Sequence, residues 1–191
     1  VEEATAREWG GELIRAWNTC GWMEQPGKIG DQIARLIGAP AGTVMVGDTL
    51  TLKLYQALGA ALKRSRRGQR ILSDTGNFPS DLYAAKAMTN DLVLVEPEDV
   101  LERLGQDIDV LMLTEVDYRT GRRHDMGALT KAAHELGIVC VWDLAHSAGA
   151  IATNLQACGA DFAVGCTYKY LNGGPGAPAF IYARDDLISA V

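Results

Sequence analysis

The chain alternates between short apolar runs and longer segments in which apolar residues recur at helical spacing. Short continuous apolar runs are typical of strands buried on both faces, whereas a helical spacing indicates a helix with one buried face. Strands are predicted over residues 43–47, 71–74, 92–95, 110–113, 138–142, 161–166 and 179–182. Helices are predicted over residues 2–18, 28–37, 54–62, 98–104 and 125–136, and from about residue 80. This alternation predicts an α/β fold: a three-layer, mainly parallel mixed sheet with helices on both faces.

Three tryptophans lie near the start of the chain. Trp9 and Trp17 belong to the helix predicted over residues 2–18, which Gly10 and Gly11 interrupt, and Trp22 follows it. Large apolar side chains are highly buried on average. We therefore interpret the three rings as packing in the core or at a subunit interface.

Composition narrows the class of function. Of the 191 residues, 48% are hydrophobic and 22% are charged, which suits a soluble globular chain with one sizeable core. The net charge of -6 argues against a nucleic-acid partner or an anionic membrane surface, and the basic run at 63–70 is interpreted as a solvated helix end and turn. No apolar run approaches the ~20 residues of a membrane span, and the N-terminus does not resemble a signal peptide. We expect a cytoplasmic chain.

The four cysteines are widely spaced, and none belongs to a cluster with zinc-ligand spacing. They are Cys20, Cys140, Cys158 and Cys166. We expect reduced thiols and no metal site. Cys166 is close in sequence to Lys169, but its place at the end of an apolar strand favours a packing role.

The densest group of reactive residues follows the strands predicted over 138–142 and 161–166. Four side chains that can carry chemistry leave these strand ends: Asp143, His146, Tyr168 and Lys169. Open α/β sheets bind ligands at the carboxyl ends of their strands. We therefore expect these side chains to lie at one edge of the sheet.

A lysine and an aspartate at neighbouring strand ends fit pyridoxal 5'-phosphate. This cofactor needs a lysine amine to react with its aldehyde, and a carboxylate to keep its pyridine nitrogen protonated, so that the ring can accept electrons. Lys169 and Asp143 supply these two groups. Taken singly, they are also consistent with a solvated lysine and a strand-end turn aspartate, and the pattern alone leaves both interpretations open.

Two further polar positions suit the same site. The stretch from Asp48 to Thr51 leads into a predicted helix, whose free backbone N–H groups could bind a phosphate, although an ordinary N-cap explains it equally well. Thr114 leaves the strand predicted over 110–113, and a plain strand-end threonine is the alternative there.

Three strings resemble one enzyme family. WDLAHSAGA at 142–150, GCTYKYLNGGPG at 165–176 and FPSDLY at 78–83 resemble segments of the kynureninases, fold-type I pyridoxal-phosphate enzymes of the class V aminotransferase group. The similarity runs from the EWG..LI..WN..GW pattern near the start to the strand at 179–182, which it implies is antiparallel. It also implies an aspartate-aminotransferase-like large domain. Residues 1–191 would form an incomplete cofactor-binding part of it, without the small C-terminal domain.

The resemblance implies a role for each matching residue. Lys169 would bond the cofactor and move the substrate α-proton, and Tyr168 would protonate the β-carbon after cleavage and contact the phosphate. Phe78 would stack on the pyridine ring. The implied cofactor contacts are Leu50, Thr51, Phe78, Pro79, Ser80, Asp81, Thr114, Asp143, His146, Tyr168 and Lys169.

The function implied for the complete protein is hydrolysis of L-kynurenine, or 3-hydroxykynurenine, to anthranilate, or 3-hydroxyanthranilate, and L-alanine. This reaction would serve tryptophan catabolism and NAD biosynthesis, in a homodimer with an amino-acid substrate. One alternative is a cysteine desulfurase or selenocysteine lyase of the same fold, against which the FPSD string weighs. The other is a fragment that binds the cofactor without turnover.

Overall fold

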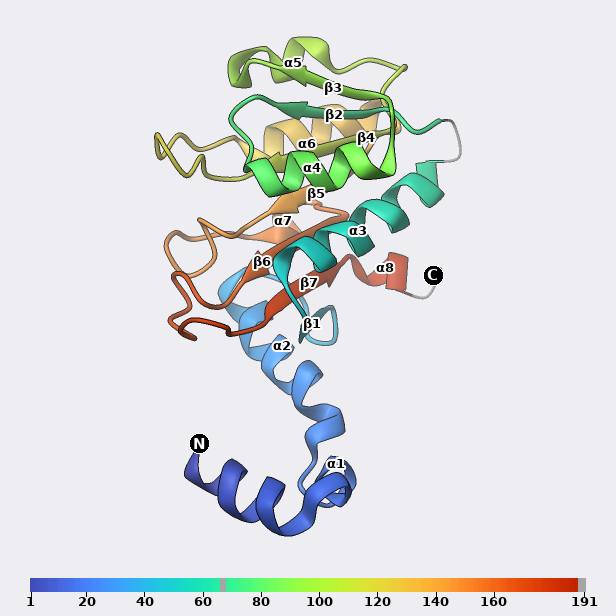
Figure 1. The fold of residues 1–191 in the computed structure, drawn as a ribbon. Helices are drawn as coiled ribbons and strands as arrows, with labels where there is room; N and C mark the ends of the chain where they lie inside the picture. The colour runs from blue at the N-terminus through green and yellow to red at the C-terminus, as the bar shows by residue number, and fades with distance from the viewer. Residues whose placement is uncertain (66–67, 189–191) are drawn as a thin grey trace.

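A computed structural model describes residues 1–65 and 68–188, and its centre is a seven-stranded mixed sheet (Figure 1). The strands lie in the order β1-β7-β6-β5-β4-β2-β3. Their bounds are β1 Val44–Gly47, β2 Ile71–Asp74, β3 Leu92–Val95, β4 Val110–Thr114, β5 Val139–Asp143, β6 Phe162–Cys166 and β7 Ala179–Ala183. Strands β2 to β6 pair in parallel, whereas β7 pairs antiparallel with both β1 and β6. The predicted mainly parallel mixed sheet and its antiparallel last strand are confirmed.

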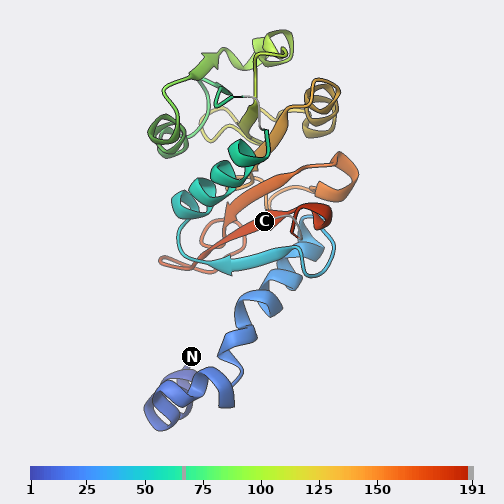
Figure 2. The same ribbon diagram turned by 90° about the vertical axis from the view of Figure 1, so that its right-hand side faces the viewer.

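Helices cover both faces of the sheet, which gives the predicted three layers (Figure 2). The longer helices are α2 Gln25–Leu36, α3 Leu50–Ser65, α4 Pro79–Met88 and α6 Met126–Glu135, and the short ones are η4 Pro97–Asp99, α5 Val100–Arg103, α7 Leu155–Cys158 and α8 Asp185–Ile188. Helices α3, α4 and α8 share one buried cluster with the sheet, and α2, α5, α6 and α7 share the other. Each face of the sheet is thus closed by apolar side chains.

The central strands β4, β5 and β6 are buried along their whole length. In their parallel register Thr114 lies beside Asp143, and Asp143 lies beside Val164. Strand β1 runs antiparallel to β7 and so in the same direction as β6, which brings the loop after Gly47 to the same edge. The segments that follow β1, β2, β4, β5 and β6 therefore meet at one edge of the sheet.

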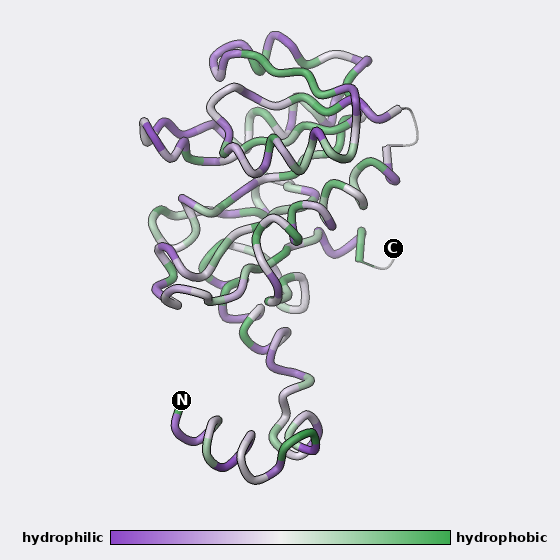
Figure 3. The backbone as a smooth tube through the Cα atoms, in the orientation of Figure 1, coloured by the Kyte–Doolittle hydropathy of each residue, from purple (hydrophilic) through white to green (hydrophobic). Residues whose placement is uncertain are grey.

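The first 24 residues form a helical arm that stands apart from the sheet (Figures 1 and 3). It consists of a π-helical segment η1 (Glu3–Glu12), short helices η2 (Leu13–Arg15), α1 (Ala16–Thr19) and η3 (Trp22–Glu24), and α2 connects it to the sheet. Trp9 stacks on Trp22 at 5.9 Å between ring centroids, but Trp9 is 61% exposed and Trp17 is 45% exposed. Core packing of these two rings, one of the two predicted interpretations, is wrong, because both faces of the sheet are closed by other helices.

Two sequence expectations concern other parts of the surface. In the basic run 63–70, residues 66 and 67 lie outside the described residues, while 63–65 form the last turn of α3 as expected. Across residues 1–65 and 68–188, no helix combines the length and apolar character needed to span a bilayer.

Candidate functional site

A cavity of about 330 Å³ opens at the edge of the sheet where the strand-end segments meet. It is lined by Asp48, Thr49, Leu50, Thr51, Phe78, Ser80, Asp143, Ala145, Tyr168, Lys169, Pro175, Gly176, Ala177 and Ala179. These residues come from four separate stretches of the chain, 48–51, 78–80, 143–145 and 168–179, and the order of the strands brings them together. The cavity is at the carboxyl edge, as the sequence predicts.

The Lys169 amine lies at the centre of this group. Its Nζ is 2.8 Å from His146 Nε2 and 5.3 Å from the centre of the Phe78 ring. Burial, and then the positive charge of Lys169, hold the pKa of His146 below its usual value. A neutral imidazole can accept a hydrogen bond, so the ammonium of Lys169 donates to His146 Nε2. His146 thus holds the amine in place beside the Phe78 ring.

Asp143 and Asp81 form a buried acidic pair next to the cavity. Burial, and then the charge of Asp143, raise the pKa of Asp81 to about 8. Burial also raises the pKa of Asp143, to about 6. A hydrogen bond from the Ala145 N–H and the charge of Lys169 act in the opposite direction and lower this pKa, but burial has the larger effect. Asp81 Oδ2 is buried and has no hydrogen-bond partner among the described residues. At neutral pH the two carboxyl groups therefore retain about one proton between them.

The Tyr168 hydroxyl is better suited to donate a proton than to accept one. Burial raises the pKa of this phenol, so Tyr168 stays protonated at neutral pH. Its ring lies 5.8 Å from Lys169 Nζ, and the residue is 43% exposed. A protonated hydroxyl beside the lysine and open to the cavity can donate a proton to a bound molecule.

The N-terminus of α3 closes the other end of the cavity. Leu52 N donates to Thr49 Oγ1 at 3.4 Å, so Thr49 serves as the N-cap of the helix. The first backbone N–H groups of a helix have no partner within it, and the helix dipole favours an anion there. Leu50 and Thr51 follow the cap and line the cavity. The predicted N-cap and the predicted phosphate position thus fall on adjacent residues.

Several predicted contact residues do not line the cavity themselves. Thr114 is buried and donates to the Asp143 backbone oxygen at 3.4 Å, and Pro79 begins α4. Asp81 is fully buried and interacts with Asp143, and His146 contacts Lys169, which lines the cavity. These residues support those that face the cavity, and direct cofactor contact by them stays a prediction.

Tyr118 is a further residue of the site, and the sequence pattern does not single it out. Its ring meets the Phe78 ring edge-on at 4.9 Å and lies 6.0 Å from the His146 ring. Its only sequence signal is an aromatic residue shortly after the polar end of β4. Phe78, Tyr118 and His146 therefore form an aromatic wall around the lysine.

A pyridoxal phosphate molecule fits this set of residues. The cavity offers an amine at Lys169, a buried acidic pair, an aromatic ring at Phe78 and a helix N-terminus at its far end. Asp143 is the member of the acidic pair that lines the cavity, so its carboxyl group can accept a hydrogen bond from a ring N–H. The residues present thus match the cofactor's amine, nitrogen and phosphate requirements.

A second histidine–aspartate group lies at the opposite edge of the sheet. His134, Cys140 and Asp161 bring metal-ligand atoms within 4.8 Å of one another. The Asp161 carboxylate, however, already pairs with His134 Nε2 and Arg184 Nη1, each at 2.8 Å, and accepts from the Cys140 N–H. Burial also raises the pKa of the Cys140 thiol, which opposes the thiolate a metal would need. We interpret this group as a structural link between α6 and β6.

Known proteins resemble the chain both in sequence and in fold. The chain is 46% identical to a kynureninase of Pseudomonas fluorescens, covering 100% of this chain and 49% of that protein. It is 49% identical to a kynureninase of Deinococcus radiodurans, covering 97% and 47%. The chain thus spans about half the length of these curated relatives. A cysteine desulfurase structure from Escherichia coli superposes with a TM-score of 0.76 over 94% of this chain and 47% of that one, at 18% identity, which shows a shared fold.

A family comparison agrees with both findings. Residues 30–191 match the class-V aminotransferases, and these enzymes and the kynureninases depend on pyridoxal phosphate. The matched region contains the whole sheet and every residue that lines the cavity. From its sheet, its lysine-centred cavity and this match, the chain belongs to the class-V aminotransferase family.

Proposed function

We propose that the intact protein hydrolyses L-kynurenine, or 3-hydroxykynurenine, to anthranilate, or 3-hydroxyanthranilate, and L-alanine, with pyridoxal phosphate bound in the cavity. The observation that carries the proposal is the convergence of Lys169, the Asp81–Asp143 pair and the α3 N-terminus on one cavity. The 46% and 49% identity to kynureninases favours this reaction within the family.

When bound, pyridoxal phosphate supplies an electron sink for bonds broken at the substrate's α- and β-carbons. Lys169 lines the cavity and would hold the cofactor through its amine, and the same amine would carry the substrate α-proton; among the described residues His146 Nε2 is its hydrogen-bond partner. Asp143, paired with Asp81, would keep the ring nitrogen protonated. Leu50 and Thr51, at the start of α3, would bind the phosphate.

Tyr168 and Phe78 have separate tasks. The protonated Tyr168 hydroxyl donates a proton to the β-carbon after the Cβ–Cγ bond breaks. Phe78 lines the cavity and would pack on the face of the ring, and its backbone N–H donates to Asn77 Oδ1 at 2.7 Å, which holds the start of α4. The neutral His146 accepts from Lys169 and orients the amine.

Lys169→Ala in the intact protein tests the proposal. We expect no visible absorbance from lysine-bound cofactor and no cofactor fixed to the protein by borohydride. Lys131→Ala, which removes an exposed lysine on α6, should leave both signals unchanged. A reducible adduct that persists in Lys169→Ala would overturn the assignment.

Product analysis separates the alternatives. Anthranilate and alanine from kynurenine support the proposal, sulfide from cysteine would indicate a desulfurase, and cofactor binding without either product would indicate a non-catalytic protein. The desulfurase structures share only the fold with this chain, at 18% and 20% identity. The sequence comparison therefore favours kynurenine as the substrate.

We further propose a homodimer that acts in the cytoplasm, within tryptophan catabolism and NAD biosynthesis. Support for the dimer comes from the helical arm, which exposes a run of large apolar residues. These are Trp9, Leu13, Ile14, Trp17 and Met23, each at least 45% exposed. Apolar groups gathered on one exposed segment are typical of a surface that a partner covers. We propose that residues 1–191 form part of a cofactor-binding large domain.

A further inference from the structure

Residues 115–124 form a hairpin that leaves the end of β4 and returns to α6. His124 N donates to Glu115 O at 2.9 Å, and Asp117 N donates to Arg122 O at 2.9 Å. Asp117 Oδ1 also accepts from the backbone N–H groups of Arg119 and Thr120, which fixes the turn. Tyr118 therefore sits on a rigid turn.

The turn brings Tyr118 against the aromatic wall of the cavity. Its ring contacts the edge of Phe78, with 4.9 Å between ring centroids and 69° between ring planes. Phe78 in turn lies under the Lys169 amine. The position of the hairpin thus decides how the Phe78 ring is packed.

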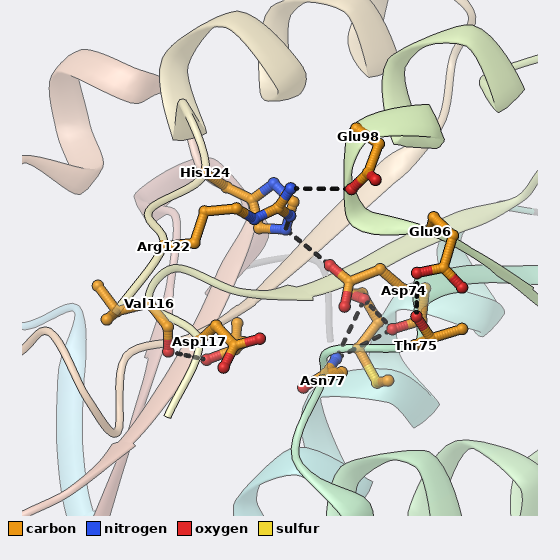
Figure 4. Close-up of polar contacts among 12 residues, drawn as sticks. Asp74, Thr75, Asn77, Glu96, Glu98, Val116, Asp117, Arg122 and His124 are labelled. Carbon is orange, nitrogen blue, oxygen red and sulfur yellow. Dashed lines mark hydrogen bonds and ion pairs between the residues drawn. The ribbon is translucent and has the colours of Figure 1, made fainter. Parts of the chain in front are cut away.

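A buried contact between His124 and Asp74 attaches the base of the same hairpin to the end of β2 (Figure 4). His124 Nε2 lies 2.6 Å from Asp74 Oδ2, and the two residues are 9% and 1% exposed. Asp74 ends β2, four residues before Phe78. The hairpin is therefore fixed twice to the stretch that runs from Asp74 through the loop to Phe78: at its base through His124 and at its turn through Tyr118.

His124 is the direct partner of the Asp74 carboxylate. An ionised carboxylate only accepts hydrogen bonds, so Nε2 must carry the proton and donate to Asp74. Nε2 then has no free lone pair to accept a hydrogen bond from Arg122 Nη2, which lies 3.1 Å away. The Arg122 guanidinium pairs instead with Glu98, with 3.6 Å between Nη1 and Oε2. Asp74 Oδ1 is buried without a hydrogen-bond partner among the described residues. Loss of His124 would leave this buried carboxylate unpaired.

Gly76 lets the hairpin approach the loop. A Cβ at this position would lie 2.8 Å from Asp117 Oδ2 and 3.1 Å from Asp74 Oδ1. The Asp117 carboxylate cannot easily move away, because its other oxygen holds the turn. Any side chain at 76 would push the hairpin off the loop.

We propose that His124 and Asp74 are positioning residues: their buried pair sets the distance between Tyr118 and Phe78, and through it the packing of the ring beside Lys169. The inference rests on the proposed cofactor site, and it assigns a role to two residues that do not line the cavity. Neither residue touches the cofactor. They act through Phe78 and Tyr118.

His124→Gln in the intact protein tests the inference through cofactor affinity and through the visible circular dichroism of the bound cofactor. Edge-to-face ring contacts contribute about 0.5–1.5 kcal/mol, so we expect a three- to tenfold rise in the pyridoxal phosphate Kd. The dichroism per bound cofactor should also change, because the aromatic environment of the ring differs. Tyr118→Ala should have the same effects, and the double variant should bind no more weakly than Tyr118→Ala alone.

His134→Gln is the control, because it breaks a histidine–aspartate pair at the opposite edge of the sheet. It should leave the Kd and the dichroism unchanged even if it lowers Tm. A Kd for His124→Gln equal to that of the parent, or effects of His124→Gln and Tyr118→Ala that simply add, would overturn the inference.

Gly76→Ala gives a second test that keeps both His124 and Asp74 in the sequence and instead crowds the carboxylates of Asp117 and Asp74 with the added Cβ. It provides the decisive measurement if His124→Gln fails to fold. It should weaken cofactor binding by a similar factor, and an unchanged Kd would overturn the inference. If the parent protein itself binds no pyridoxal phosphate, the proposed function is wrong, and this inference, which depends on it, is wrong as well. Binding by the parent and equally by the variants would overturn the positioning role alone.

Discussion

Two carboxyl groups that share a proton, Asp81 and Asp143, make the folded protein sensitive to pH. Their pKa values, about 8 and about 6, lie above the usual value because the groups are buried together. A carboxyl whose pKa is raised on folding stabilises the protein below its unfolded pKa, near 4, and that stability is lost as pH rises through the folded pKa. The cofactor-free protein should thus lose stability from about pH 4 to about pH 8.

Asp81→Asn should remove most of this sensitivity, because the amide resembles the protonated carboxyl but does not titrate. In the absence of cofactor, its Tm should exceed that of the parent by several degrees at pH 8.5, at about 2–4 °C per kcal/mol for a domain of this size. The two Tm values should converge toward pH 4. Thermal unfolding at a series of pH values measures the gap. A gap that stays constant from pH 5 to pH 8.5 would contradict the shared proton.

Tyr168→Phe distinguishes a proton donor from a phosphate contact. Loss of a positioned general acid typically costs ~10² to 10⁴ in rate, and here only the step after Cβ–Cγ cleavage needs the proton. In single-turnover experiments anthranilate should appear in a burst while alanine release lags. Equal slowing of both products, together with weaker cofactor binding, would instead make the hydroxyl a phosphate ligand.

At the scale of elements, the start of α3 combines two tasks on two threonines that flank Leu50. Both line the cavity, but Thr49 caps the helix, whereas Thr51 follows the cap, where we propose the phosphate binds. Thr51→Val should therefore weaken pyridoxal phosphate binding by about tenfold and leave the binding of pyridoxal, which lacks the phosphate, nearly unchanged. Thr49→Val is the matched control and should mainly lower stability, by about 1 kcal/mol. Equal losses for both ligands in Thr51→Val would place the phosphate elsewhere.

The strands and the helical arm show what the sequence predicts well and what it does not. Continuous apolar runs at 110–113 and 138–142 predict β4 and β5 to within a residue, because burial on both faces leaves no other stable state. In the arm, apolar spacing predicts a buried face for residues 2–18, yet spacing alone does not say which element covers it. No described element does so there, and Gly10 and Gly11 weaken the helix.

The candidate site likewise contains residues whose place the sequence predicts and residues whose place it does not. Lys169, Asp143 and Phe78 follow strands directly, so their shared edge is predictable from local pattern. Tyr118 lies in a turn whose place depends on the His124–Asp74 pair, which joins residues 50 positions apart. The pairing of Asp81 with Asp143 likewise depends on the three-dimensional packing of α4 against the sheet. A periodic pattern carries no information on such long-range contacts.

At the scale of the whole molecule, the exposed arm gives the proposed homodimer a test. Trp17→Asp places a charge on the apolar surface of the arm, and burying it at an interface would cost well over 1 kcal/mol. The dimer dissociation constant should rise at least tenfold, as measured by light scattering across a concentration series. Leu101→Asp, at an exposed position on α5, should leave the mass unchanged. If neither substitution changes the dimer dissociation constant, the arm is not part of the interface.

The insertion of β7 between β1 and β6 determines when the cavity can form during synthesis. β1 ends at Gly47, but the strand that pairs with it in the described part of the sheet, β7, begins at Ala179. Ala179 N also donates to Asp48 O at 3.0 Å, which holds the loop before α3. At a typical ribosomal rate of about 5–20 residues per second, β1 waits on the order of 10 s for its partner strand. The phosphate end of the site is thus among the last parts of the nascent chain to become ordered. A polypeptide that still lacks β7 already contains Lys169, but the loop before α3 that would bind the phosphate is not yet held in place.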